Sequence, residues 1–249
     1  MKKLIPLLFL SSMAFGGTRT LSFGPGGGTI TISSGTAGAG GSPLTFVQAV
    51  STATDDGGCG STLTPITPTA GHLLVMGCYT PNNISGITVS DNVGDSWLTA
   101  GTTTQSANFT AIYYVKSAVG GATTVTAAVN ACNGRSFCIL AEYSGQDPSN
   151  TFDVFSGSTP VATSLSPITA LSTTTTHANE LMFAFGAESS GGAITSQTGT
   201  SRYEDQWLAG GTRWFAQDSN VPTAQVYAST WTAASYWNWS AVQAAFNHL

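Results

Sequence analysis

The sequence predicts an all-β protein, an antiparallel two-sheet β-sandwich of the jelly-roll or Greek-key type with two similar halves. Short apolar segments of strand length recur between turn residues, which is typical of sandwiches. No segment combines a sustained apolar period of 3.6 residues with helix caps. Stretches of the first half also resemble stretches of the second half. These three observations together favour strands throughout the chain.

The strongest strand signal is a short apolar run at 136–145 between Gly-containing turns. Segment 240–246 resembles it, with apolar residues that match at every second position. We therefore expect both segments to be interior strands, each with its matched face in the core, and each half to contribute strands to both sheets. The matched residues are Ile139 with Val242, Ala141 with Ala244 and Tyr143 with Phe246; an upstream pair, 70–75 with 178–183, agrees in the same order.

The first residues have the pattern of a secretory leader, which we assign to 1–17. Lys2 and Lys3 precede an apolar run at 4–10 that is too short to span a bilayer. Small residues in the segment 11–16, directly after this apolar run, suit cleavage after Gly16. No later apolar run is long enough for a transmembrane helix. The protein is therefore expected to be secreted, either extracellular or on the cell surface.

A lead-in and one domain follow this leader. Residues 18–43 are rich in Gly, Ser and Thr, which predicts a flexible segment with one short strand at 29–32. Residues 44–249 are predicted to be the sandwich domain, because strand and turn signals alternate along them. The expected strands are 46–51, 72–79, 87–91, 97–100, 109–116, 123–129, 137–143, 181–187, 213–217, 224–228 and 237–246.

Composition argues against one class of partner. Only 8% of the residues are charged, against about 25% in an average soluble domain. With 7 Lys and Arg and a formal net charge of −5, the chain lacks the basic surface that phosphate backbones require. We therefore expect no nucleic-acid partner. No cofactor motif is present in the sequence, and none is predicted.

Four cysteines follow the leader, and an even number in an exported protein predicts two disulfides with three alternative connectivities. Cys132 and Cys138 flank a good hairpin turn, so we expect a bridge between them. That pairing leaves Cys59 to bond Cys78. Metal binding by these cysteines is disfavoured because no C-x2-C spacing occurs.

Period-two geometry offers one candidate ligand surface. If the matched core residues face inward, Trp237, Trp239 and Gln243 share the opposite face of their strand, and Glu142 occupies that face in the other copy. Two indoles could stack on a sugar ring while the amide bonds its hydroxyls. The alternative is that the indoles pack under a loop or against another sheet, since Trp is usually buried. If the protein binds a glycan, we therefore expect the glycan to lie on the face of Trp237, Trp239 and Gln243.

Five motifs spread over most of the mature chain support a family resemblance: GHLLV at 71–75, VSDNVGDSW at 89–97, IYYVK at 112–116, AEYSG at 141–145 and NELM at 179–182. In these motifs the chain resembles exported bacterial sandwich domains of the concanavalin-like, jelly-roll type. That resemblance implies extracellular adhesion or glycan binding only through the fold, since a fold hosts many functions.

Catalysis and metal binding have less support. Jelly-roll hydrolases carry a strand of alternating acidic residues, which this chain lacks, and no Gly-x-Ser-x-Gly elbow is present. Glu142 and Glu180 are interpreted as strand-end or cross-strand hydrogen-bonding residues. Asp91 and Asp95 could offer oxygens to Ca²⁺, but an Asx-Gly hairpin turn is preferred because their spacing matches no EF-type loop. No catalytic residue is predicted.

Three classes of function remain. The favoured one is a secreted or cell-surface, non-catalytic binding or adhesive module that recognises polysaccharide or a cell-surface glycan. The second is a structural protein of a virion or extracellular appendage, for which self-assembly would be expected. The third is a polysaccharide hydrolase. The leader favours the first class over the second, and the missing acidic strand argues against the third.

Overall fold

The computed structural model describes residues 18–22, 29–33, 42–52, 60–81, 86–105, 108–130, 136–158, 167–188, 192–207, 211–233 and 238–249. The chain divides into two compact units, Met1–Gly40 and Gly41–Leu249. In the first unit, β1 (Thr18–Ser22) pairs antiparallel with β2 (Thr29–Ser33), which includes the predicted short strand. The predicted leader at 1–17 lies outside the described residues.

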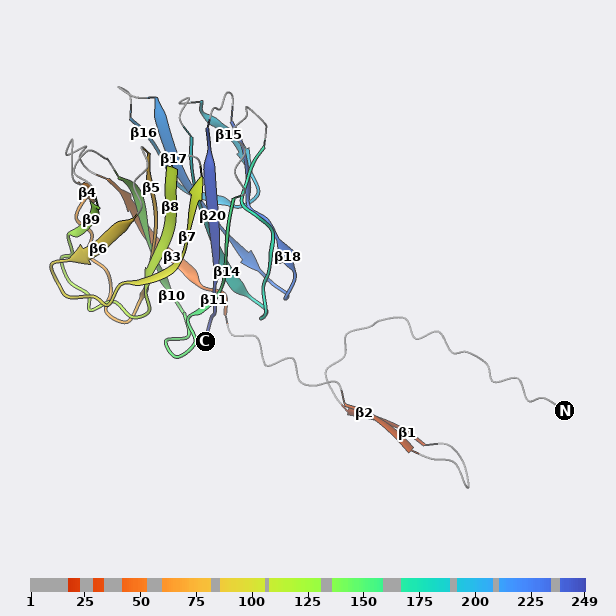
Figure 1. The fold of residues 1–249 in the computed structure, drawn as a ribbon. Helices are drawn as coiled ribbons and strands as arrows, with labels where there is room; N and C mark the ends of the chain where they lie inside the picture. Colours follow the sequence, from red (N-terminus) through yellow and green to blue (C-terminus); the bar gives the residue numbers. More distant parts are fainter. Residues whose placement is uncertain are drawn as a thin grey trace. The chain divides into compact units, whose positions relative to one another are not determined.

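Two five-stranded antiparallel sheets form the centre of the second unit (Figure 1). We call them the first-half sheet and the second-half sheet. The first has the order β3 (Thr45–Ser51), β10 (Phe137–Ser144), β5 (Leu73–Thr80), β8 (Asn108–Val115), β7 (Leu98–Gln105). The second has the order β11 (Phe152–Gly157), β20 (Ser240–Phe246), β14 (Glu180–Glu188), β17 (Thr212–Val221), β16 (Thr200–Trp207). Apolar side chains of both sheets form one shared core between them.

The two sheets repeat one design. Each strand of the first-half sheet has a counterpart at the same place in the second-half sheet, in the order given above. The registers agree as well, because Tyr143 pairs with Leu73 just as Phe246 pairs with Leu181. These are the residues that the sequence comparison of the two halves places in equivalent positions. The predicted similarity of the halves is therefore confirmed.

Each half nevertheless builds its own sheet, so the expectation that each half contributes strands to both sheets is wrong. The physical reason is that pairing within one half joins strands that are closer in sequence and needs fewer long crossovers. A shared irregularity supports the common design: the outer strand of each sheet bulges at the equivalent point. These bulges lie between Thr99 and Gly101 in β7 and between Ser201 and Tyr203 in β16.

The two segments with the strongest strand signal are interior strands, as predicted. β10 lies between β3 and β5, and β20 lies between β11 and β14. The side chains of Ile139, Ala141, Val242 and Ala244 are fully buried in the shared core. Alternation along each strand therefore directs the matched residues inward, as the sequence pattern requires.

Smaller sheets cover the outer faces of both large sheets (Figure 1). In the first half a three-stranded sheet encloses a second apolar core, and in the second half an equivalent sheet encloses a third. The domain thus has four sheet layers, and β10 and β20 are buried on both faces. The small sheets are β4 (Gly60–Thr62), β9 (Val125–Val129), β6 (Ile87–Asp91); β12 (Ile168–Thr169), β19 (Thr230–Ala233), β15 (Ile194–Gln197); and β13 (Thr173–Thr174) with β18 (Val226–Tyr227).

The predicted all-β antiparallel sandwich is confirmed, and every described element is a strand. The strand orders do not by themselves identify a jelly roll. Sequence analysis missed β1, β4, β11, β12, β13, β15, β16 and β19, which are short or carry polar side chains along a partly exposed strand. Such strands lack the apolar run that marks a buried one. The part of the chain that is described contains no helix suited to crossing a membrane.

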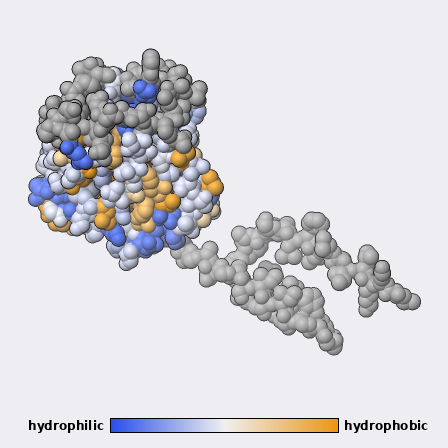
Figure 2. Space-filling view, in the orientation of Figure 1, coloured by the Kyte–Doolittle hydropathy of each residue, from blue (hydrophilic) through white to orange (hydrophobic). Residues whose placement is uncertain are grey.

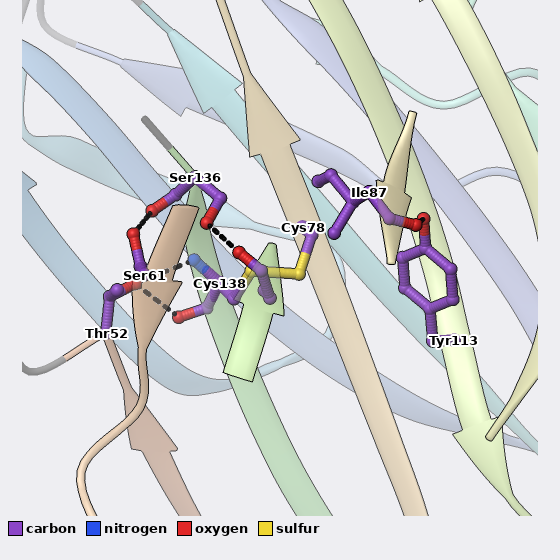
Figure 3. The surroundings of a disulfide bond; sticks show 8 residues. Thr52, Ser61, Cys78, Ile87, Tyr113, Ser136 and Cys138 are labelled. Carbon is purple, nitrogen blue, oxygen red and sulfur yellow. Dashed lines mark hydrogen bonds between the residues drawn. A yellow bond between two sulfur atoms is a disulfide. The ribbon is translucent and has the colours of Figure 1, made fainter. Parts of the chain in front are cut away.

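The disulfide prediction is wrong, because Cys78 bonds Cys138 (Figure 3). The two residues are direct cross-strand partners on β5 and β10, with Cα atoms 4.2 Å apart. Cys138 therefore cannot bond Cys132, nor Cys78 bond Cys59. The hairpin argument failed because it judged closeness along the chain, whereas sheet pairing brings together residues 60 positions apart. Cys59 and Cys132 themselves lie outside the described residues.

Candidate functional site

The predicted sugar-binding face is not a surface. Trp239, Gln243 and Glu142 are all buried, and Trp237 lies outside the described residues. Trp239 packs with Trp231 and Phe215 in the third core, beneath the small sheet β12-β19-β15. The prediction that these three residues face a glycan is therefore wrong. The alternative reading, that the indole packs against another sheet, is the one found for Trp239.

Gln243 serves the fold from this buried position. Its Oε1 accepts a hydrogen bond from the Ser229 backbone N–H at 2.8 Å. Its Nε2 donates to the carbonyl oxygens of Leu171 at 2.8 Å and Tyr227 at 3.0 Å. The amide thus ties β20 to segments that cover it, and its polar atoms are already engaged.

Glu142 anchors the corresponding place in the first half, as its interpretation as a cross-strand hydrogen-bonding residue predicted. Its Oε2 accepts a bond from Gln48 Nε2 at 2.6 Å, and Gln48 is its partner on β3. Its Oε1 accepts from the Thr69 backbone N–H at 2.9 Å and lies 2.6 Å from His72 Nδ1. A fully buried carboxylate with three partners is a structural tie rather than a free acid or base.

The Asp91–Asp95 segment forms the predicted Asx turn but not a hairpin, because β6 before it pairs with β9 and β7 after it pairs with β8. Asp91 Oδ1 accepts the backbone N–H groups of Val93, Gly94 and Asp95 at 2.9, 2.7 and 3.2 Å. Its Oδ2 accepts from the Trp97 indole at 2.6 Å. Both oxygens of the proposed calcium ligand are therefore bonded within the turn, in the manner of an Asx motif. Burial raises the pKa of the Asp95 carboxyl, and the nearby Asp91 raises it further, while a hydrogen bond from Val119 lowers it.

A different group of side chains has the composition of a metal centre. Asp153, His177 and Glu180 each offer a ligand atom, and these atoms all lie within 4.8 Å of one another. Among the described residues this is the one set of three His, Cys, Asp or Glu side chains found so close together. Carboxylate oxygens and imidazole nitrogens are common ligands of divalent cations. We call these three residues the Asp-His-Glu cluster.

Two parts of the second half position the cluster, the strand β11 and the turn that leads into β14. Asp153 lies on the outer strand β11, and Glu180 is the first residue of β14. His177 belongs to the turn before β14, where Asn179 has a φ of 59°. Asn tolerates this left-handed conformation better than most residues, and it turns the chain into the strand. Because β20 separates β11 from β14, the two carboxylates meet only after the sheet forms.

The cluster is electrostatically unusual at Glu180. The residue is fully buried, its Oε1 lies 3.3 Å from His177 Nδ1, and its Oε2 has no hydrogen-bond partner. Burial and the Asp153 carboxylate raise the pKa of Glu180 to about 7, while hydrogen bonds with His177 lower it. Asp153, by contrast, is well bonded: it accepts the Thr176 backbone N–H at 2.9 Å and the Thr176 hydroxyl at 2.6 Å.

Sequence analysis missed the cluster apart from Glu180, which it treated as a hydrogen-bonding residue. One local signal was available, the spacing of His177 and Glu180 three residues apart at the start of a predicted strand. Asp153 gave none, because its strand β11 was not predicted. Only the register of β11 on β20 brings it to the same place.

Comparison of the chain with protein-family models, with curated proteins and with solved structures finds no match. The resemblance to concanavalin-like exported domains therefore stays a prediction.

Proposed function

We propose that this protein is an exported, non-catalytic binding or adhesive module that recognises polysaccharide or a cell-surface glycan. The disulfide between Cys78 and Cys138 supports export, because disulfides persist mainly in oxidising compartments outside the cytosol. The leader-like residues at 1–17 support it independently.

The buried, hydrogen-bonded position of Glu142 is the observation that favours a binding module over a hydrolase. A glycosidase needs two carboxyl groups about 5–10 Å apart that face a substrate. Glu142 is instead buried against Gln48, Thr69 and His72. Glu204 likewise bonds Arg213 at 2.6 Å on the second-half sheet. These carboxylates hold strands together, which suits a rigid scaffold that presents a surface.

The surface itself has the character of a hydroxyl-rich module. On the face shown in Figure 2, apolar side chains occur in small groups among residues of intermediate hydropathy. Thr102 and Thr104 are exposed on the outer strand β7, and Thr195 and Ser196 are exposed on β15. Hydroxyl groups donate and accept hydrogen bonds, so they can exchange water for sugar hydroxyls. Binding would then use these outer strands and not the buried Trp239 face.

Retention on polysaccharide, measured together with cleavage, tests the proposal. The purified protein is passed over a panel of immobilised neutral and acidic polysaccharides and applied to a glycan array, while released reducing ends are assayed. We expect retention that free oligosaccharide competes away, with no release of reducing ends. Release of reducing ends would show a hydrolase. Retention on no glycan, together with filaments in electron micrographs, would instead support the structural-appendage alternative and overturn the proposal.

A further inference from the structure

The Asp-His-Glu cluster brings Asp153 on β11 together with two potential ligands, His177 and Glu180, from a later segment of the chain. Their ligand atoms lie within 4.8 Å of one another, a spacing that a single cation can bridge after small side-chain rotations. From this geometry we propose that Asp153, His177 and Glu180 bind one divalent first-row transition-metal ion, for which Zn²⁺ is the test ion. This inference does not depend on the proposed glycan binding.

The buried carboxylate of Glu180 is the observation that points to a ligand. Its Oε2 is buried and accepts no hydrogen bond, although the side chain lies beside a second carboxylate, Asp153. A buried carboxylate oxygen without a donor is costly, and a second carboxylate beside it adds to the cost. The contact that His177 makes with Glu180 uses the other oxygen, with Nδ1 at 3.3 Å from Oε1. A cation between the two carboxylates would supply the missing positive charge and a bond to Oε2.

Neighbouring groups already orient the other carboxylate. Thr176 donates to both oxygens of Asp153, through its backbone N–H to Oδ2 and its hydroxyl to Oδ1. Such outer hydrogen bonds fix the orientation of metal ligands and strengthen binding. A second buried acceptor is close by in the fold: Asn247 Oδ1 has no partner, and Asn247 follows Phe246, which pairs with Leu181 next to Glu180.

The ligand types select the class of metal. One imidazole with two carboxylates favours Zn²⁺ and related ions, whereas Ca²⁺ takes six to eight oxygen ligands. The His177 side chain is 53% exposed, so an ion can reach the cluster from solvent. Water can then complete the coordination that three protein ligands leave open.

Zinc binding is measured on protein purified without a histidine tag and stripped with chelator. Isothermal titration with ZnCl₂ at pH 7.5 and thermal melts with and without Zn²⁺ give stoichiometry, affinity and stabilisation. We expect one Zn²⁺ per chain and a higher Tm with the ion. His177→Ala should weaken binding at least about tenfold, the lower end of what even outer-shell substitutions cost, and should fold normally because the side chain is half exposed.

Glu180→Gln is the second variant, since it keeps the shape of the side chain while it removes the charge. It should abolish the rise in Tm with Zn²⁺. Glu204→Gln is the control, because it makes the same change at a carboxylate outside the cluster, and it should bind Zn²⁺ as the unaltered protein does. The proposal is overturned if the unaltered protein shows no binding, if His177→Ala binds equally well, or if Glu204→Gln loses as much affinity. Binding of Ca²⁺ in preference to Zn²⁺ would overturn the transition-metal assignment.

Discussion

At several core positions, the size of side chain that fits is set by the residue that faces it on the opposite sheet. Gly77 shows this most clearly: it lies on β5 in the first-half sheet, directly opposite Phe185 of the second-half sheet. A Cβ added at Gly77 would lie 2.3 Å from both Cβ and Cγ of Phe185. The two positions are also equivalent in the two halves, so one half supplies the ring and the other supplies the space for it. A cross-sheet polar contact lies in the same interface, where the Tyr143 hydroxyl donates to Asp218 Oδ2 at 2.8 Å.

Substitution of Gly77 by Ala should therefore overpack the shared core. We expect a loss of about 1–3 kcal/mol in the free energy of unfolding, measured by urea denaturation. Gly101→Ala is the matched comparison, since its added Cβ would meet Phe155 ring atoms at 2.3 Å. Gly101 and Phe155 belong to the outer strands β7 and β11, which can move apart more easily, so Gly101→Ala should cost less. Equal losses, or a larger loss at Gly101, would contradict this account.

At the scale of elements, the pairing of β5 with β10 determines which cysteines form the disulfide. Cys78 and Cys138 are direct partners in this pair, and their surroundings are closely bonded (Figure 3). Thr52 Oγ1 accepts from the Cys138 backbone N–H at 2.8 Å, and Ser136 Oγ donates to the Ala127 carbonyl at 2.9 Å. These bonds join β10 to β3 on one side and to the small sheet on the other. The disulfide therefore lies where three sheet strands and their cover meet.

The connectivity that the structure shows is Cys78–Cys138. Peptide mapping without reduction should recover this linked pair. Replacing Cys78 and Cys138 together by Ala should lower the free energy of unfolding by about 4 kcal/mol, because the bridge closes a loop of 60 residues in the unfolded chain. Recovery of peptides linking Cys132 to Cys138 would contradict the pairing, and an unchanged unfolding midpoint would contradict its contribution.

For the whole molecule, the decisive feature is that two similar halves share one core. Each half has its own large sheet and its own cover, yet the inner faces of both large sheets are buried only against each other. Neither half could expose that face to water without losing much of its apolar burial. The arrangement makes the duplicated sequence one folding unit.

Unfolding should accordingly be a single cooperative transition in which both halves take part. Tryptophan fluorescence reports mainly on the second half, since five of the six tryptophans are there, while far-ultraviolet circular dichroism reports on both halves. We expect the two urea transitions to coincide. Gly77→Ala, a change in the first half, should shift the tryptophan transition as much as the dichroism transition. A tryptophan midpoint that does not move would show that the halves unfold independently.

The sequence by itself determined the all-β class, the likeness of the halves and the inward face of the two interior strands. Those properties follow from local patterns: alternation sets which residues share a face, and repetition sets which strands are equivalent. It also predicted the Asx turn at Asp91, because that turn is closed by hydrogen bonds between residues close in sequence. For Glu142 it predicted a hydrogen-bonding role but not the partners, since Gln48, Thr69 and His72 lie 70 or more residues away.

Only the tertiary structure decided what covers each face and which distant residues meet. The sequence of β20 alone suggests that the face bearing Trp239 is exposed. In the structure this face is covered by the small sheet β12-β19-β15, whose strands were not predicted from the sequence. The Cys78–Cys138 bridge and the Asp-His-Glu cluster depend on strand register across a sheet. Register is set by the summed packing of many side chains, and no single segment of sequence carries that information.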